Sequence, residues 1–174
     1  PKGFYNLWCK GKTTIAKYIY KELSKRNLKI LLMAPTGTAA RRISQVIGCS
    51  ATTIHRGIKF NGSSAKFNKE NPLQIDVLMV DESSMIDLNL ADYLLRAIKP
   101  ETKIIFIGDI EQLPSVGIGS VLEDLQKAKV DTVKLDRVYR QQESNPIVDF
   151  AYDVNNKKTN YYGYLSRFLR MEEK

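Results

Sequence analysis

Residues 103–114 read Lys-Ile-Ile-Phe-Ile-Gly-Asp-Ile-Glu-Gln-Leu-Pro, and this stretch decides the fold. Its apolar run, Ile104 to Ile107, predicts a strand that is buried on both faces, as strands in a parallel sheet are. The strand would deliver Asp109 and Gln112 to its carboxyl end. Ligands of open α/β sheets bind at that end, so a site is expected there.

A second apolar run, Val77 to Val80, is followed directly by Asp81 and Glu82. We expect Asp81 to hold Mg²⁺ and Glu82 to polarise an attacking water, as in nucleotide hydrolysis. The alternative is a pair of acids that only satisfies the amino end of the next helix. Because Lys12 and Gln112 accompany the pair, the catalytic interpretation is favoured.

Helical and strand patterns alternate along the chain, which predicts a three-layer α/β fold with a mainly parallel sheet. An Asn-Gly pair at 61–62 predicts a small inserted hairpin at about 58–72. The domain is expected to span 1–157, with 158–174 as a tail or the start of a following domain. Helices are expected at 12–27, 37–47, 50–58, 88–98, 120–127 and 147–154, and strands at 28–34, 75–80, 104–107 and 132–135.

Charge is distributed unevenly. Residues 1–72 hold 14 Lys and Arg against two acids, whereas residues 73–131 hold five against 11 acids. This distribution indicates a surface for a polyanion beside a site of metal-binding carboxylates. Five of the basic residues are interpreted as solvating one helix face, namely Lys17, Lys21, Lys25, Arg26 and Lys29.

Other compositional features narrow the class of protein. No apolar run approaches the roughly 20 residues that a membrane span needs, and no signal peptide is recognisable. The two cysteines, Cys9 and Cys49, have neither the spacing of metal ligands nor that of a disulfide framework. A reducing compartment is therefore expected, with the cytoplasm as the location.

The segment Gly11-Lys12-Thr13-Thr14 before a helical pattern is typical of the end of a phosphate-binding loop. Such a loop wraps phosphate with backbone N–H groups and adds a lysine for the phosphate oxygens and a hydroxyl for Mg²⁺. The full pattern has a glycine five residues before Gly11, where this chain has Asn6. Residues 2–5 are also a poor match to the strand that is expected just before the loop. We therefore interpret residues 1–10 as a scar, or as segments joined across a gap. A native, working loop is the alternative, because Asn tolerates positive φ better than most residues.

Six motifs in this order resemble those of the first motor domain of superfamily 1 DNA helicases of the 5′-to-3′ type. The similarity is to the RecD-like family, relatives of the exodeoxyribonuclease V alpha subunit, and to the related Dda-type phage helicases. It implies a P-loop NTPase (RecA-like) fold that uses ATP and Mg²⁺. The motifs lie at residues 11–14, 34–42, 53–56, 81–85, 108–114 and 139–141.

The resemblance assigns roles at the nucleotide. Gln112 would couple the γ-phosphate to DNA, and Arg140 would reach that phosphate as an arginine finger. A surface ion pair with Asp136 or Glu143 is the alternative for Arg140. Catalysis is assigned to Lys12, Asp81, Glu82, Gln112 and Arg140; ATP binding to Gly11, Lys12, Thr13, Thr14, Gln112 and Arg140; and Mg²⁺ to Thr13 and Asp81.

The resemblance also implies a site for single-stranded DNA. Hydroxyls and helix amides in Pro35 to Thr38 suit backbone phosphates, while Arg41 either joins them or solvates its helix. His55 either contacts DNA or packs locally. Aromatic rings of the hairpin either stack on bases or fix the hairpin to the core. The DNA-binding candidates are Pro35, Thr36, Gly37, Thr38, Arg41, His55, Phe60 and Phe67.

The family's second motor domain is missing from this chain, so the fragment is not expected to unwind DNA alone. The expected partners are single-stranded DNA or a duplex–single-strand junction, the second motor domain, and a larger repair or recombination complex. A membrane is not expected as a partner. Two alternatives stay open: a nucleic-acid-binding module with an inactive motor, and a PhoH-like ATPase. No nuclease site is evident in the sequence.

Overall fold

The computed structural model describes residues 4–8, 12–110, 112 and 115–134. Its contacts divide the chain into two compact units, Pro1–Asp136 and Arg137–Lys174, and the described residues all lie in the first. The predicted helix at 147–154, Arg140 and the domain end at 157 lie outside the described residues. These three remain predictions.

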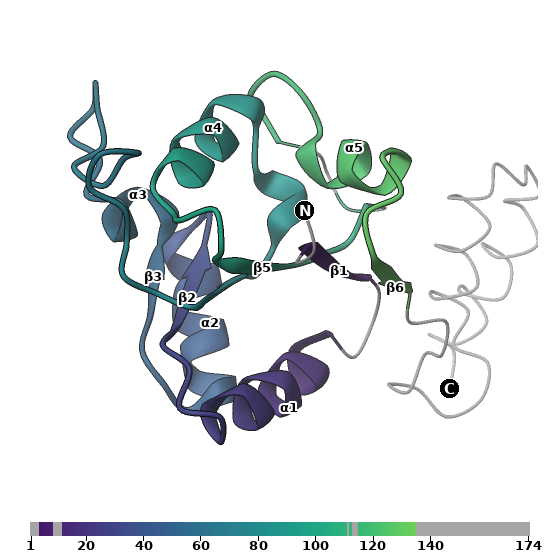
Figure 1. Cartoon of the computed structure of the whole chain (residues 1–174). Helices are drawn as coiled ribbons and strands as arrows, with labels where there is room; N and C mark the ends of the chain where they lie inside the picture. Colours follow the sequence, from purple (N-terminus) through teal and green to yellow (C-terminus); the bar gives the residue numbers. More distant parts are fainter. Residues whose placement is uncertain (1–3, 9–11, 111, 113–114, 135–174) are drawn as a thin grey trace, which may run out of the picture. The chain divides into compact units, whose positions relative to one another are not determined.

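The described part is built on a six-stranded parallel sheet with the order β3-β2-β4-β5-β1-β6 (Figure 1). Each residue of β4, and each residue of β5 after its first, is buried, as expected for the middle of a parallel sheet. The predicted mainly parallel α/β fold is confirmed. The strands are β1 (Phe4–Trp8), β2 (Ile30–Ala34), β3 (Ala51–Thr53), β4 (Val77–Val80), β5 (Lys103–Gly108) and β6 (Thr132–Lys134).

Helices cover both faces of this sheet, which gives the three layers that were expected (Figure 1). Side chains alternate along β4, so that Val77 and Met79 join one hydrophobic cluster and Leu78 and Val80 the other. The first cluster includes α1 and α2, and the second includes α3, α4 and α5. These helices are α1 (Lys12–Ser24), α2 (Gly37–Ile47), α3 (Ile54–Gly57), α4 (Leu88–Arg96) and α5 (Val121–Lys127), with a 3₁₀ turn at Ser83–Met85.

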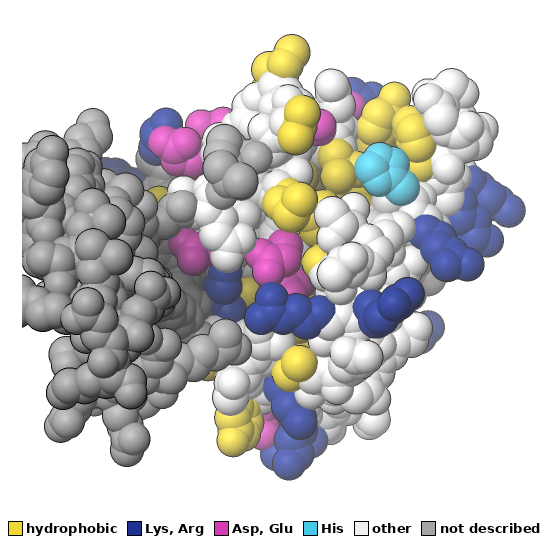
Figure 2. Space-filling view, turned by 180° about the vertical axis from the view of Figure 1, so that it is seen from behind, with side chains coloured by type: hydrophobic (Ala, Val, Ile, Leu, Met, Phe, Trp, Pro, Cys, Tyr) yellow, Lys and Arg dark blue, Asp and Glu magenta, His cyan; other side chains and the backbone are white. Residues whose placement is uncertain are grey.

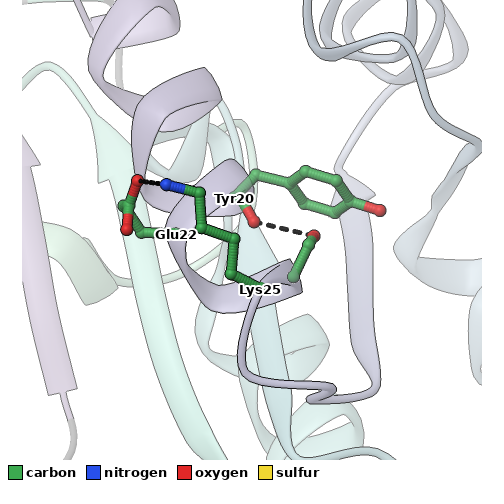
Figure 3. A network of polar contacts seen from close by, with 4 residues as sticks. Tyr20, Glu22 and Lys25 are labelled. Atoms are coloured by element: carbon green, nitrogen blue, oxygen red, sulfur yellow. Dashed lines mark hydrogen bonds and ion pairs between the residues drawn. The ribbon is translucent and has the colours of Figure 1, made fainter.

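The exposed end of α1 carries two local polar contacts that Figure 3 draws. Lys25 Nζ lies 2.6 Å from Glu22 Oε1, and the Ser24 hydroxyl donates to the Tyr20 carbonyl at 2.8 Å. The Lys25 ammonium holds the pKa of the Glu22 carboxyl below its usual value. All five basic residues interpreted as solvating one face are exposed.

Two local expectations were wrong. The segment 50–58 is not one helix: its first part is β3, in which Ala51 pairs with Leu32 of β2. The β-branched Thr52 and Thr53 favour an edge strand there, and the Thr53 hydroxyl then accepts from the Arg56 amide to begin α3.

The expectation that residues before the phosphate loop form a strand only poorly was also wrong. Residues Phe4–Trp8 form β1, which lies between β5 and β6 and pairs Trp8 with Gly108. Its aromatic and apolar residues have strong strand propensity. Asn6 lies inside β1, paired with Phe106, and only three residues connect Trp8 with the start of α1.

The inserted hairpin is present in a reduced form, with a single antiparallel bridge between Phe60 and Ala65. Its turn is closed by Asn61, whose side-chain oxygen accepts from the amides of Ser63 and Ser64 at 3.1 and 2.9 Å. Gly62 at the tip has φ +100°, which a residue with a Cβ adopts only with strain. We call residues 61–64 the Asn61 turn.

Candidate nucleotide site

Four predicted functional residues gather where β4 and β5 end and α1 begins. Because β4 and β5 are in register, their carboxyl ends carry Asp81 and Asp109 to the same edge of the sheet. Lys12, the first residue of α1, places its Nζ 3.9 Å from Asp109 Oδ2. The structure thus brings Lys12, Asp81 and Asp109 to one edge of the sheet, and the roles assigned to the predicted residues stay predictions.

Asp81 is buried, with a relative exposure of 6%. Its amide donates to the Met33 carbonyl at 2.9 Å, so it continues the alignment of β4 with β2. Burial raises the pKa of the Asp81 carboxyl, and the amide of Glu82 and the charges of Lys12 and Arg42 oppose that rise. The two cations favour the ionised form of Asp81, and an ionised carboxylate is the oxygen ligand that Mg²⁺ takes.

Glu82 differs from its neighbour in backbone and surroundings. Its φ of 50° and ψ of 43° are left-handed, a conformation that costs a residue with a side chain about 1 kcal/mol or more. Its Oε1 lies 3.7 Å from Arg42 Nη1, and its side chain is 19% exposed. The turn directs Glu82 toward α2, away from the line of β4.

The floor of the site is closely packed. A Cβ on Gly108 would lie 2.6 Å from Leu122 Cδ2 and 3.1 Å from the Ser84 amide nitrogen, so glycine is required there. The Ser83 hydroxyl donates to the Val80 carbonyl at 2.8 Å and fixes the 3₁₀ turn beneath the two acids.

Three buried polar atoms have no hydrogen-bond partner among the described residues: Lys12 Nζ, Glu82 Oε2 and Ser84 Oγ. Such atoms are costly in a folded protein unless a ligand or water satisfies them. An ammonium, a carboxylate oxygen and a hydroxyl at one sheet edge fit a phosphate group with its Mg²⁺ and an attacking water. The residues present therefore suit Mg-ATP.

The remaining nucleotide candidates are placed only in part. Thr13 is half-buried in the first turn of α1, and Thr14 is exposed. Gln112 is exposed, and its amide donates to the Asp109 carbonyl at 3.1 Å, which keeps it beside the site. Gly11 and Arg140 lie outside the described residues. No group of three His, Cys, Asp or Glu side chains in the described ranges is arranged as a metal site.

The predicted DNA segment forms the start of α2. Thr36 is the N-cap, and its hydroxyl accepts from the Ala39 amide at 3.2 Å. Gly37, Thr38 and Arg41 are exposed, and Pro35 is half-buried. The Thr36 hydroxyl thus has a capping role in addition to the predicted contact with phosphate.

Two of the aromatic candidates, His55 and Phe60, belong to one row of edge-on ring contacts. His55 meets Phe60 edge-on at 5.5 Å between ring centroids, and Phe60 meets Tyr93 of α4 at 4.9 Å. Phe60 and Phe67 both pack against the core, which supports their role in fixing the hairpin. His55 is exposed, and Figure 2 shows the histidine side chain beside hydrophobic ones.

Sequence reasoning missed two residues of this site and gave a third no role. Asp109 was expected at this edge of the sheet because it follows a buried strand, as Asp81 does, but no task was assigned to it. Arg42 is adjacent to the predicted Arg41, and the two differ only in their position around the axis of the helix. Ser84 gave no signal, because a buried hydroxyl without a partner is visible only in three dimensions.

Residues 10–167 match the family model described as an AAA domain. The chain belongs to the AAA domain family. This AAA domain is 38% identical over 144 residues to the ATP-dependent RecD2 DNA helicase of Deinococcus radiodurans, covering 83% of the chain and 20% of that protein. It is 35% identical over 161 residues to the ATP-dependent DNA helicase dda of Enterobacteria phage T4, covering 87% of the chain and 37% of that protein.

A RecBCD enzyme subunit RecD from Buchnera aphidicola is 33% identical over 193 residues, covering 94% of the chain and 32% of that protein. The resemblance to RecD-like helicases is thereby confirmed. The chain spans at most about two fifths of the length of these three curated relatives.

Solved structures agree on the fold. Bacteroides Pif1 bound to single-stranded DNA gives a TM-score of 0.60 at 20% identity, over 94% of this chain and 44% of that one. A Pif1 structure at forked duplex DNA gives 0.61 at 20% identity, over 91% and 45%. Within the described part of the AAA domain, no helix is long and apolar enough to cross a bilayer.

Proposed function

We propose that this chain is the ATP-binding and ATP-hydrolysing first motor domain of a RecD-like 5′-to-3′ DNA helicase that binds single-stranded DNA. One observation carries the proposal: Lys12, Asp81, Glu82 and Asp109 converge at one sheet edge, where buried polar atoms remain unsatisfied by the described residues. The RecD-like relatives support the same activity.

Each residue has a distinct task in this proposal. Lys12 places a point charge on the phosphate oxygens, and its 3.9 Å separation from Asp109 keeps it oriented before nucleotide arrives. Asp81 and Thr13 hold Mg²⁺, which, when bound with ATP, neutralises charge on the transferred phosphoryl group. Gln112 and Arg140 contact the γ-phosphate.

Glu82 is the water-activating base. Its carboxylate is mostly shielded from solvent yet keeps one oxygen without a partner in the described residues, so a water can bind there. A base must lie within hydrogen-bond reach of the proton that it accepts, and the left-handed turn at Glu82 provides this position beside Asp81.

Single-stranded DNA is assigned to the start of α2. Exposed amides and hydroxyls at Gly37 and Thr38 face solvent together with Arg41, which suits backbone phosphates. The longer protein is proposed to add a second motor domain, to act in the cytoplasm and to join a repair or recombination complex. Without that second domain, this chain should bind DNA but not unwind it.

Calorimetric titration of Mg-ATP into this chain tests the nucleotide site, with Lys12→Ala as the matched variant. Binding that is lost in Lys12→Ala supports a working phosphate site. Equal binding by both proteins would contradict the role of Lys12. No binding by either would mean that the three-residue connection after β1 does not form a phosphate loop.

A second candidate function follows from that connection. Asn6 lies inside β1 where the loop pattern has its first glycine, and the family match begins only at residue 10. A nucleic-acid-binding module with an inactive motor would explain both facts. It predicts that affinity for single-stranded DNA is the same with and without Mg-ATP, whereas a working motor predicts a difference.

A further inference from the structure

Arg42 lies between the two sites just described. It is on α2, six residues after the N-cap Thr36 and four after Thr38, so Thr38 and Arg42 share one helix face. Its guanidinium also approaches Glu82, with Nη1 3.7 Å from Oε1. One side chain thus connects the proposed DNA surface with the proposed catalytic base.

The two partners differ in exposure. The Arg42 side chain is 55% exposed and the Glu82 side chain 19%. The guanidinium can therefore reach solvent and a new anion, whereas the carboxylate is held by the left-handed turn. On the face drawn in Figure 2, some Lys and Arg side chains lie next to acidic ones.

The pair has consequences for the base. At 3.7 Å the contact is an ion pair, longer than a hydrogen bond, and its attraction draws Oε1 of Glu82 toward α2. A half-exposed pair of this kind is worth only about 0.5–1 kcal/mol, so a phosphate of DNA can compete for the guanidinium. The interaction is strong enough to orient Glu82 and weak enough to be exchanged.

We propose that Arg42 is a positioning residue that restrains Glu82 when DNA is absent, and that a phosphate of single-stranded DNA bound at the start of α2 takes over its guanidinium and releases the carboxylate. The inference rests on the proposed function and adds the regulation of that site. DNA binding and the readiness of the base are then coupled, and the coupling must act in both directions.

A binding cycle without nucleotide tests the proposal. Affinity for a fluorescein-labelled oligothymidylate is measured by anisotropy for the unaltered chain, Glu82→Gln, Arg42→Ala and the double variant. Removing the Glu82 charge frees Arg42, so Glu82→Gln should tighten binding about two- to fivefold. In the Arg42→Ala background the same change should have no effect.

Two matched controls separate the pair from general charge effects. Arg41→Ala removes the neighbouring cation on the same helix, and in that background Glu82→Gln should still tighten binding. Asp92→Asn removes one negative charge on α4, paired there with Arg96, and should leave affinity unchanged. If Arg42→Ala unfolds the chain, Arg42→Gln replaces it in the cycle.

The outcomes distinguish this inference from the proposed function. Tightening by the same factor with and without Arg42 overturns the inference, as does the absence of tightening in the unaltered background. Because no nucleotide is present, failure of the phosphate loop does not affect the result. No binding of oligothymidylate by any variant would overturn both the inference and the DNA part of the proposed function.

Discussion

Asp81 and Glu82 are adjacent in the chain but occupy different surroundings. Asp81 continues β4 and is buried, whereas Glu82 turns into the left-handed region and faces Arg42. The separate roles proposed for these two neighbouring carboxyl groups rest on this difference in backbone and surroundings.

Replacing Glu82 by Gln should keep nucleotide affinity near its original value and reduce hydrolysis about 10²- to 10⁴-fold, the usual contribution of a general base. Phosphate release by the longer protein measures the rate, and calorimetry measures affinity. Glu123→Gln on α5, an exposed acid paired with Lys127, is the control. Unchanged turnover in Glu82→Gln would refute its assignment as the base.

Replacing Asp81 by Asn should raise the melting temperature of the nucleotide-free chain by a few degrees. The side chain is buried and burial disfavours its charge, so a neutral isostere removes a cost of folding. Mg-dependent nucleotide binding should be lost at the same time. Scanning calorimetry in the presence of a chelator measures stability; a lower melting temperature would show that the charge is well compensated.

At the scale of elements, α2 has specified ends. Thr36 caps its amino terminus, and Gly48 ends it in the left-handed conformation with φ 84°. Between them the buried Ala39, Ala40 and Ile43 hold it against the sheet. A helix fixed at both ends presents Thr38, Arg41 and Arg42 in a constant arrangement, which suits recognition of a repeating backbone.

Thr36→Ala should cost about 1 kcal/mol of stability, because the first turn of α2 loses its cap. Thr36→Ser keeps a hydroxyl and should retain most of that stability, and Thr38→Ala should have little effect. Urea denaturation of the three variants measures the differences. Equal stability of Thr36→Ala and the unaltered chain would indicate that the hydroxyl serves DNA alone.

At the scale of the whole molecule, charge is not spread evenly. The basic residues of 1–72 include the exposed lysines of α1 and also Arg41 and Arg42 of α2, and Arg42 lies 3.7 Å from Glu82. On α1, Lys25 is paired locally with Glu22 (Figure 3). Net charge alone therefore does not identify the surface that binds DNA.

Replacing Arg41 by Ala should reduce the slope of log K against log salt for single-stranded DNA by about 0.7, as expected when one phosphate contact is lost. Lys25→Ala should leave the slope unchanged. Anisotropy titrations at several salt concentrations measure both slopes. Equal reductions would assign the α1 face to DNA as well and contradict its interpretation as solvated surface.

Much of this structure was predictable because the signals are local. Strand runs such as Val77–Val80 and the helix at 37–47 follow from hydrophobic pattern and capping. The strand at Ala51–Thr53 depends on its pairing with β2, which no local pattern specifies, whereas the bridge between Phe60 and Ala65 is local and the Asn-Gly pair indicated it. Asp81 and Glu82 were identified because they follow a buried strand, and Arg42 was missed because its partner is 40 positions away.

The Asn61 turn has a practical consequence. The side chain of Asn61 closes the turn. The turn is fixed to the domain mainly through Phe60, so the tip contributes little to the core. Exposed tips of this kind are the positions where proteins tolerate inserted or attached groups. A dye at Ser64 should therefore leave the fold unchanged, and its signal on addition of single-stranded DNA would test the predicted contact between the hairpin and DNA.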